Sequence, residues 1–229
     1  MNAEETLARL RSISDRARLE GMSRYGIKVD RALGVSMPEM RSFAKTLGKD
    51  HQLAMDLWRS GVHEARIMTS LLADPKILTE EQMEEMVRDL DSWDVCDQCS
   101  SNLFSRSPLA LRKALEWSGR EGEFQKRAGF VTMAALAVHG KKLREEDLVL
   151  MLDATVRESH DDRNYVRKAV NWALRQIGKR DMRTNALAIS AAERIMAKGD
   201  RASRWVASDA LRELRGEAVR ERLKSRQGR

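Results

Sequence analysis

Apolar residues recur along the chain with the spacing of amphipathic helices. In segments of about ten to twenty residues they fall at positions i, i+3, i+4 and i+7, which places them on one helical face. The pattern predicts roughly eleven or twelve helices and no strand. Glycines follow these apolar runs, where helices are expected to end: Gly48, Gly61, Gly140, Gly178 and Gly199.

Prolines and capping residues mark where several helices should begin. Ser36–Pro38 and Ser107–Pro108 each place a hydroxyl just before a proline. A proline in the first turn of a helix costs little, because its missing N–H would have no partner there. Thr79 and Gln82 have the spacing of a capping box. The sequence therefore predicts helix starts after residues 36, 79 and 107.

Related helical segments recur along the chain. The segment Val166–Gly178 has the V-R-x-A-x-x-x-A-L-x-x-I-G pattern of an inner HEAT helix, and its arginine has counterparts before and after it. The last two spacings between these arginines, 40 and 37 residues, match one pair of helices per repeat. With the helix around Asp97, the series has five members, which carry Arg66, Asp97, Arg127, Arg167 and Arg204.

The repeats predict the fold class. We expect an all-α fold, a right-handed HEAT-like α-solenoid of paired antiparallel helices with a concave basic face lined by one helix of every pair. No linker or low-complexity stretch interrupts the pattern, so residues 1–229 are expected to form a single domain.

Composition narrows the class of protein. Hydrophobic residues make up 42% and charged residues 34%, a mixture that excludes a disordered chain and a membrane-inserted one. The polar start Met1–Glu5 does not resemble a secretory signal. With only two cysteines there is no disulfide framework, which fits a reducing compartment. We expect a cytoplasmic protein associated with the nucleoid.

Charge is distributed unevenly. The formal net charge is +7, and residues 163–229 hold eighteen Lys or Arg against seven Asp or Glu. A basic segment of this kind favours a polyanionic partner such as nucleic acid, although solvated Arg-rich helix faces would give the same composition. The stretch Thr79–Asp97 holds eight acids and one arginine, and we expect most of these acids on an outer helix and the turn after it.

The Cys96-x-x-Cys99 spacing invites a metal or redox interpretation. No second cysteine pair accompanies it and it lies within a predicted helix, so two ordinary buried thiols are favoured. The four histidines are widely scattered. The sequence therefore predicts no metal site and no cofactor.

Trp93 and Asp97 are the first candidates for chemistry. They lie four residues apart and so share a helical face. A ring face beside a carboxylate suits a cation with an aromatic body, and an alkylated purine is such a cation. The alternative is a buried tryptophan that packs the core, with Asp97 capping a neighbouring helix.

Four ordered motifs resemble one family. They are Gly34-Val35-Ser36-Met37-Pro38-Glu39-Met40-Arg41, Leu57-Trp58 with His63-Glu64-Ala65-Arg66, the Trp93-x-x-x-Asp97 pair, and the segments Phe124–Ala128 and Val166–Arg175. Together they are similar to the AlkD-like DNA alkylation repair proteins, which are HEAT-like glycosylases for 3-methyladenine and 7-methylguanine. The likeness spans nearly the whole chain. Two features depart from the family pattern: Ser92 precedes the tryptophan in place of an aromatic residue, and the spacing from Arg127 to Trp172 is longer, with 157–163 expected as an insertion.

The resemblance implies roles for individual residues. Trp93 and Trp172 would flank the modified nucleotide, and Asp97 would stabilise positive charge on the sugar and position the attacking water. Arg127 would hold the phosphate beside the lesion. On the predicted inner helices, Arg66, Arg167 and Arg204 would add further DNA contacts.

The function predicted from the sequence is therefore a monofunctional glycosylase that releases cationic alkylpurines from double-stranded DNA. We expect it to act as a monomer, with no metal and no membrane partner. Two alternatives stay open, because a helical solenoid also suits a catalytically silent nucleic-acid-binding module or a protein scaffold. Asp97 favours the enzyme, since a carboxylate in a basic groove would otherwise only repel phosphate.

Overall fold

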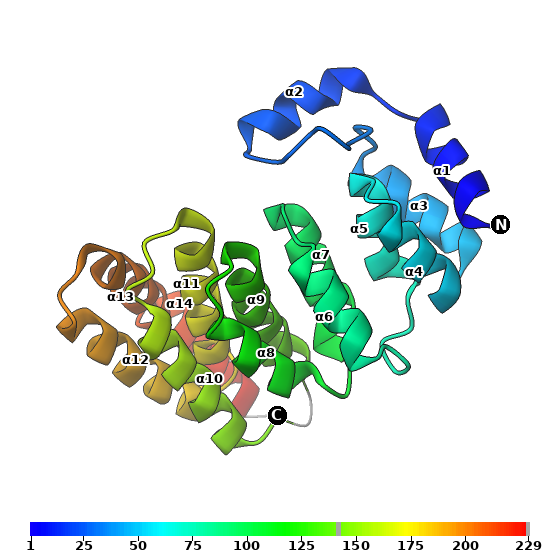
Figure 1. Cartoon of the computed structure of the whole chain (residues 1–229). Helices are drawn as coiled ribbons and strands as arrows, with labels where there is room; N and C mark the ends of the chain where they lie inside the picture. Colours follow the sequence, from blue (N-terminus) through cyan, green and yellow to red (C-terminus); the bar gives the residue numbers. More distant parts are fainter. Residues whose placement is uncertain (141–142, 228–229) are drawn as a thin grey trace. The chain divides into compact units, whose positions relative to one another are not determined.

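The computed structural model describes residues 1–140 and 143–227. Within these residues the chain forms fourteen α-helices and one short 3-10 helix, with no strand (Figure 1). The prediction of an all-α fold is confirmed, but the number of helices was underestimated. Helix α2 (Arg16–Arg24) has no fully buried residue.

Contacts divide the chain into two units, of which the first is Met1–Pro108. Its helices pack mainly as α4 on α5, α3 on α5, and α5 on α7. The elements of this unit are α1 (Ala3–Ser12), α2, α3 (Met37–Leu47), α4 (His51–Arg59), α5 (His63–Leu72), α6 (Glu80–Arg88), α7 (Trp93–Asn102) and the 3-10 helix η1 (Phe104–Arg106).

The second unit is Leu109–Arg229. Here α9 packs between α8 and α11, and α11 packs in turn against α13, while α12 covers α11 and α13 (Figure 1). The elements of this unit are α8 (Ala110–Ser118), α9 (Glu123–His139), α10 (Glu145–Glu158), α11 (Asn164–Gly178), α12 (Met182–Ala197), α13 (Arg201–Leu214) and α14 (Glu217–Gln227). The expectation of a single domain stays a prediction.

Every second helix carries one member of the predicted charged series. Helices α5, α7, α9, α11 and α13, which we name the inner series, contain Arg66, Asp97, Arg127, Arg167 and Arg204 respectively. The repeat read from the arginine spacing therefore corresponds to real pairs of helices.

The capping signals were correct at two of the three predicted helix starts. Ser36 and Thr79 cap α3 and α6, and each forms a capping box with the residue three positions later. Ser107–Pro108 does not begin a helix directly. The chain makes a further turn there, and α8 starts at Ala110 without a side-chain cap.

Close packing adds a second role for the glycine at which α11 ends, as the sequence predicted. Gly178 is the last residue of α11, and a Cβ atom there would lie 2.6 Å from Cδ2 of Leu214 on α13. Gly129 has a similar role inside α9, where a Cβ would lie 2.5 Å from the backbone nitrogen of Ser118. These glycines let neighbouring helices approach each other closely.

The acidic stretch lies mostly where the sequence analysis placed it. Four glutamates belong to α6, and Asp89 and Asp91 lie in the turn before α7. Both cysteines are fully buried, as expected for ordinary core thiols. Among the described residues, no group of His, Cys, Asp or Glu is arranged to hold a metal ion. No helix in the described part of the chain has the length and apolar character needed to cross a membrane.

The glycine at the contact between α8 and α9 gives a test of this packing. Gly129→Ala should lower the free energy of unfolding by about 1–3 kcal/mol, because the new methyl group meets backbone atoms that cannot move aside. Urea denaturation followed by circular dichroism measures the change. Gly21→Ala is the matched control, since it lies inside α2 with nothing within 4 Å of the added Cβ, and it should stabilise by roughly 0.5–1 kcal/mol. Equal effects of the two changes would contradict close packing at Gly129.

Candidate functional site

Trp93 and Asp97 occupy the first two turns of α7. Trp93 is the first residue of the helix and is half-buried, and its Nε1 donates a hydrogen bond to the carbonyl oxygen of Tyr25 at 3.0 Å. Asp97 is also half-buried, one turn further along. Trp93 is therefore no part of the fully buried core, which removes the simplest alternative to a role at the surface.

The segment 25–36, which supplies the partner of Trp93, is fixed by a buried carboxylate. Glu64 is fully buried at the start of α5 and accepts hydrogen bonds from the backbone N–H groups of Leu33 (2.9 Å) and Gly34 (2.8 Å). Gly34 has a φ of +76°, and a Cβ there would lie 2.1 Å from the carbonyl oxygen of Asp15. Only glycine fits this position without moving the backbone. The Glu64 contacts thus hold the segment against α5.

A histidine–aspartate pair joins α5 to the start of α7. His63 Nε2 lies 2.8 Å from Oδ2 of Asp94, whose other oxygen accepts hydrogen bonds from Ser92 and Val95. Burial alone would lower the pKa of His63, but the hydrogen bond and negative charge of Asp94 outweigh it and raise that pKa. Burial likewise opposes ionisation of Asp94, yet its hydrogen bonds lower its pKa. The pair therefore favours its charged form and anchors the helix that carries Trp93 and Asp97.

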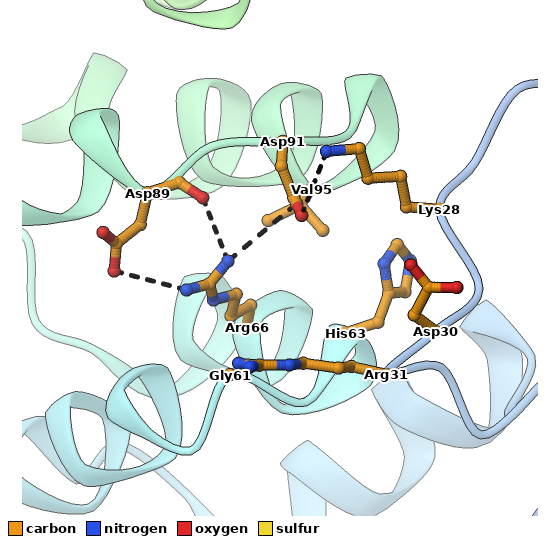
Figure 2. A pocket seen from close by; sticks show the side chains of 9 residues that line it. All are labelled: Lys28, Asp30, Arg31, Gly61, His63, Arg66, Asp89, Asp91 and Val95. Atoms are coloured by element: carbon orange, nitrogen blue, oxygen red, sulfur yellow. Dashed lines mark hydrogen bonds and ion pairs between the residues drawn. The ribbon is translucent and has the colours of Figure 1, made fainter.

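Arg66, a predicted DNA contact, lies in a pocket of about 350 Å³ beside this pair (Figure 2). Its guanidinium donates to the backbone carbonyl and the carboxylate of Asp89, and lies 3.9 Å from Asp91. It also stacks over the ring of Trp58 at 4.8 Å. These contacts tie α5 to the turn before α7 and balance the charge of Arg66. Its role in DNA binding stays a prediction.

Arg127 in the second unit is largely buried at the start of α9, with an exposed fraction of 7%. Its Nη1 donates to the carbonyl oxygen of Tyr165 on α11 at 2.7 Å, and its guanidinium lies 6.0 Å from the centre of the Tyr165 ring. The same ring lies 5.4 Å from that of Phe124. Tyr165 thus fixes the position of Arg127 from the neighbouring helix.

An ion-pair network next to Arg127 holds the loop between α10 and α11. Lys126 Nζ lies 2.6 Å from Glu158 and 3.1 Å from Asp161, and Arg163 also pairs with Asp161. Burial would raise the pKa of Asp161, but the hydrogen bonds from Arg163 and Lys126 lower it to about 2. The stretch 157–163, expected as an insertion, is therefore tied to α9 by charged contacts.

The remaining predicted residues lie on α11 and α13. Trp172 is half-buried and packs against the apolar core of its unit. The guanidinium of Arg167 lies 4.5 Å from the centre of the Trp205 ring, and Arg204 is exposed next to that ring in the sequence. The predicted roles of these residues in catalysis or binding stay predictions.

Sequence reasoning missed the aromatic partners of the arginines. Each inner helix from α7 to α13 has an aromatic residue within its first five positions: Trp93, Phe124, Tyr165 and Trp205. The sequence does contain an aromatic residue close to the arginine or aspartate of each of these four helices. It does not form a recognisable motif, because the residue type and the exact position change from one repeat to the next.

The predicted site residues form two groups. Trp93, Asp97 and Arg66 belong to residues 1–108, on α7 and the adjacent α5. The other predicted residues belong to the second unit, on three successive inner helices: Arg127, Trp172, Arg167 and Arg204. Each group offers aromatic rings beside charged side chains near the beginning of its helices.

Comparison with known proteins supports the fold. A solved structure described as "a new family of proteins related to the HEAT-like repeat DNA glycosylases with affinity for branched DNA structures" is similar to the chain, with a TM-score of 0.75 and 19% identity. The similarity covers 85% of this chain and 83% of that one, and it confirms the HEAT-like fold. No curated protein matches the chain significantly.

The family model described as "DNA alkylation repair enzyme" matches residues 6–214. This range includes every helix of the inner series and all the predicted site residues. The protein therefore belongs to the DNA alkylation repair enzyme family.

Proposed function

We propose that the protein is a DNA glycosylase that removes cationic alkylpurines, such as 3-methyladenine and 7-methylguanine, from double-stranded DNA. The observation that carries this proposal is the pairing of a half-buried carboxylate, Asp97, with a half-buried ring, Trp93, one turn away on α7. Membership of the DNA alkylation repair enzyme family supports the same reaction class.

The proposed reaction needs little help with the leaving group. Alkylation at N3 or N7 gives the purine a positive charge, so the base leaves with the electron pair of the C1′–N bond and becomes neutral. Positive charge then develops on the sugar, and a fixed carboxylate stabilises it. In this proposal Asp97 has that role. A water molecule, which Asp97 also positions, forms the new C1′–O bond and releases a proton.

Other residues would hold the DNA. In the proposal, Trp93 contacts the sugar of the modified nucleotide. In the second unit, Trp172 supplies an aromatic contact to DNA and Arg127 binds a phosphate. The contacts of Arg127 with Tyr165 suit this role, because they hold the guanidinium in one place before DNA arrives. The protein would act as a monomer on alkylated duplex DNA, in the cytoplasm and without a cofactor.

A catalytically silent DNA-binding protein is the second candidate. The similar solved structure is described as having affinity for branched DNA, which favours a role in binding without base release. Asp97 argues for the enzyme. A carboxylate among DNA-binding cations weakens phosphate binding, and a contribution to the reaction would account for its presence there. A release assay separates the two candidates.

Asp97→Asn tests the reaction itself. Release of 3-methyladenine or 7-methylguanine from methylated duplex DNA should fall by about a hundredfold or more, because the neutral amide no longer stabilises the charged sugar. Binding to the same DNA should stay equal or become tighter, since a negative charge is lost. Chromatography of the freed bases and fluorescence anisotropy measure the two quantities.

Asp153→Asn is the matched control for this change, because Asp153 is an exposed carboxylate on α10 that pairs with Arg194. It should release bases like the wild type. Equal release by wild type and Asp97→Asn would remove Asp97 from the reaction, and no release by the wild type would favour the silent binder.

Arg127→Ala tests the phosphate contact. Affinity for duplex DNA should fall, and the slope of log Kobs against log salt concentration should become shallower by about one unit, because one phosphate contact is lost. Arg127→Lys, which keeps the charge, should retain most of the slope. Arg194→Ala on α12 provides the control and should leave the slope unchanged. A slope that is the same in wild type and Arg127→Ala would exclude the contact.

A further inference from the structure

Trp205 is unusual among the tryptophans of the second unit because a large part of it faces solvent. It is the fifth residue of α13, and 38% of it is exposed. By contrast, Trp117 is fully buried and Trp172 packs against the core. Exposing this much of an indole ring to water costs free energy. Packing alone therefore does not explain the position of Trp205.

One face of the Trp205 ring is covered by an arginine from the neighbouring helix. The guanidinium of Arg167 on α11 lies 4.5 Å from the ring centre. Its Nε is buried and has no hydrogen-bond partner among the residues that the structure describes, so the stack takes part of the guanidinium out of water without a compensating acceptor there. The contact holds the plane of the ring in a fixed orientation while the rest of the indole stays open.

The first unit contains a second arginine–tryptophan stack that serves as an internal comparison. Arg66 lies 4.8 Å from the Trp58 ring, but Trp58 is only 1% exposed and Arg66 pairs with Asp89. That stack is closed to solvent and its charge is balanced. Arg167 has no carboxylate partner among the described residues, and its tryptophan is open.

Three further cations lie within four residues of Arg167 or Trp205 in the sequence, on the same two helices. Lys168 follows Arg167 on α11, and Arg201 and Arg204 lie in the first turn of α13. All three are exposed, and within the described part of the chain none has a carboxylate at ion-pair distance. The nearest acid in the sequence, Asp200, is occupied as the N-cap of α13, where it accepts a hydrogen bond from the N–H of Ser203.

We propose that Trp205, backed by Arg167, is a stacking platform for an unpaired nucleobase of DNA, with Lys168, Arg201 and Arg204 binding the adjacent phosphates. A flat ring can stack on a base only where the face of that base is accessible, which in DNA means a nucleotide outside regular pairing. Cations around an aromatic platform are the usual means of holding the backbone on either side of it. The proposal rests on the DNA-binding part of the proposed function, but not on base release.

The test uses the full chain and lesion-free DNA, so that it does not depend on the glycosylase reaction. Fluorescence anisotropy with a labelled single-stranded oligonucleotide of mixed sequence, and with the duplex formed from it, gives both affinities. Trp205→Ala should weaken single-strand binding by about tenfold or more, because one stacking contact is lost. It should weaken duplex binding by less than about threefold, since paired bases do not present their faces.

Two further variants control for the fold and for the ring. Trp205→Phe keeps an aromatic face and should recover part of the single-strand affinity. Ser208→Ala changes an exposed residue of the same helix and should bind like the wild type. Thermal melting by circular dichroism shows whether each variant is folded before its affinity is compared.

The outcomes are distinct. A selective loss of single-strand affinity in Trp205→Ala, with recovery in Trp205→Phe, supports the platform. An equal loss on single strand and duplex, unchanged affinities, or a wild type that does not bind the single strand would each overturn it. Base release and single-strand affinity are measured in separate assays, so failure of the proposed reaction and failure of the platform are distinguishable.

Discussion

The burial of the inner helices is the constraint on which the rest of the structure depends. In α9 every residue from Lys126 to Ala137 is buried, because α8 and α11 pack against the helix. Along such a helix a charged group is stable only if it is paired, as Lys126 is with Glu158 and Asp161. In α9 the side chains that remain partly exposed near the start of the helix include Phe124, next to the largely buried Arg127.

The same constraint explains how much the sequence could predict. Apolar periodicity, the capping boxes at Ser36 and Thr79, and the arginine spacing identified the all-α fold and the inner series correctly, because each depends on local chemistry. The end of α11 at Gly178 was predicted, but the contact of this glycine with Leu214, far away in the sequence, was not. Tertiary contacts of this kind leave no local pattern.

The candidate site was predictable only in part. The shared face of Trp93 and Asp97 followed from helical spacing, and their partial exposure agrees with it. What spacing could not reveal is the set of partners that hold the charged residues: His63 for Asp94, Asp89 for Arg66, and Tyr165 for Arg127. These pairs join different helices. Arg66 and Arg204 belong to the same repeat series but differ in their surroundings. The charge of Arg66 is balanced by Asp89, whereas Arg204 is exposed.

The weak packing of α2 affects the hydrogen bond that holds the indole of Trp93. With no buried side chain, α2 is held by its Asp15 cap, by the contacts of Arg18 with Glu39 and Gly34, and by the segment that follows it, so its local opening requires less free energy than unfolding of α5 or α9. The carbonyl that accepts the hydrogen bond of the Trp93 indole belongs to Tyr25, the C-cap of this helix. Fraying of α2 would release that indole while α7 stays folded, so the ring can exchange between a tethered and a free state faster than the domain unfolds.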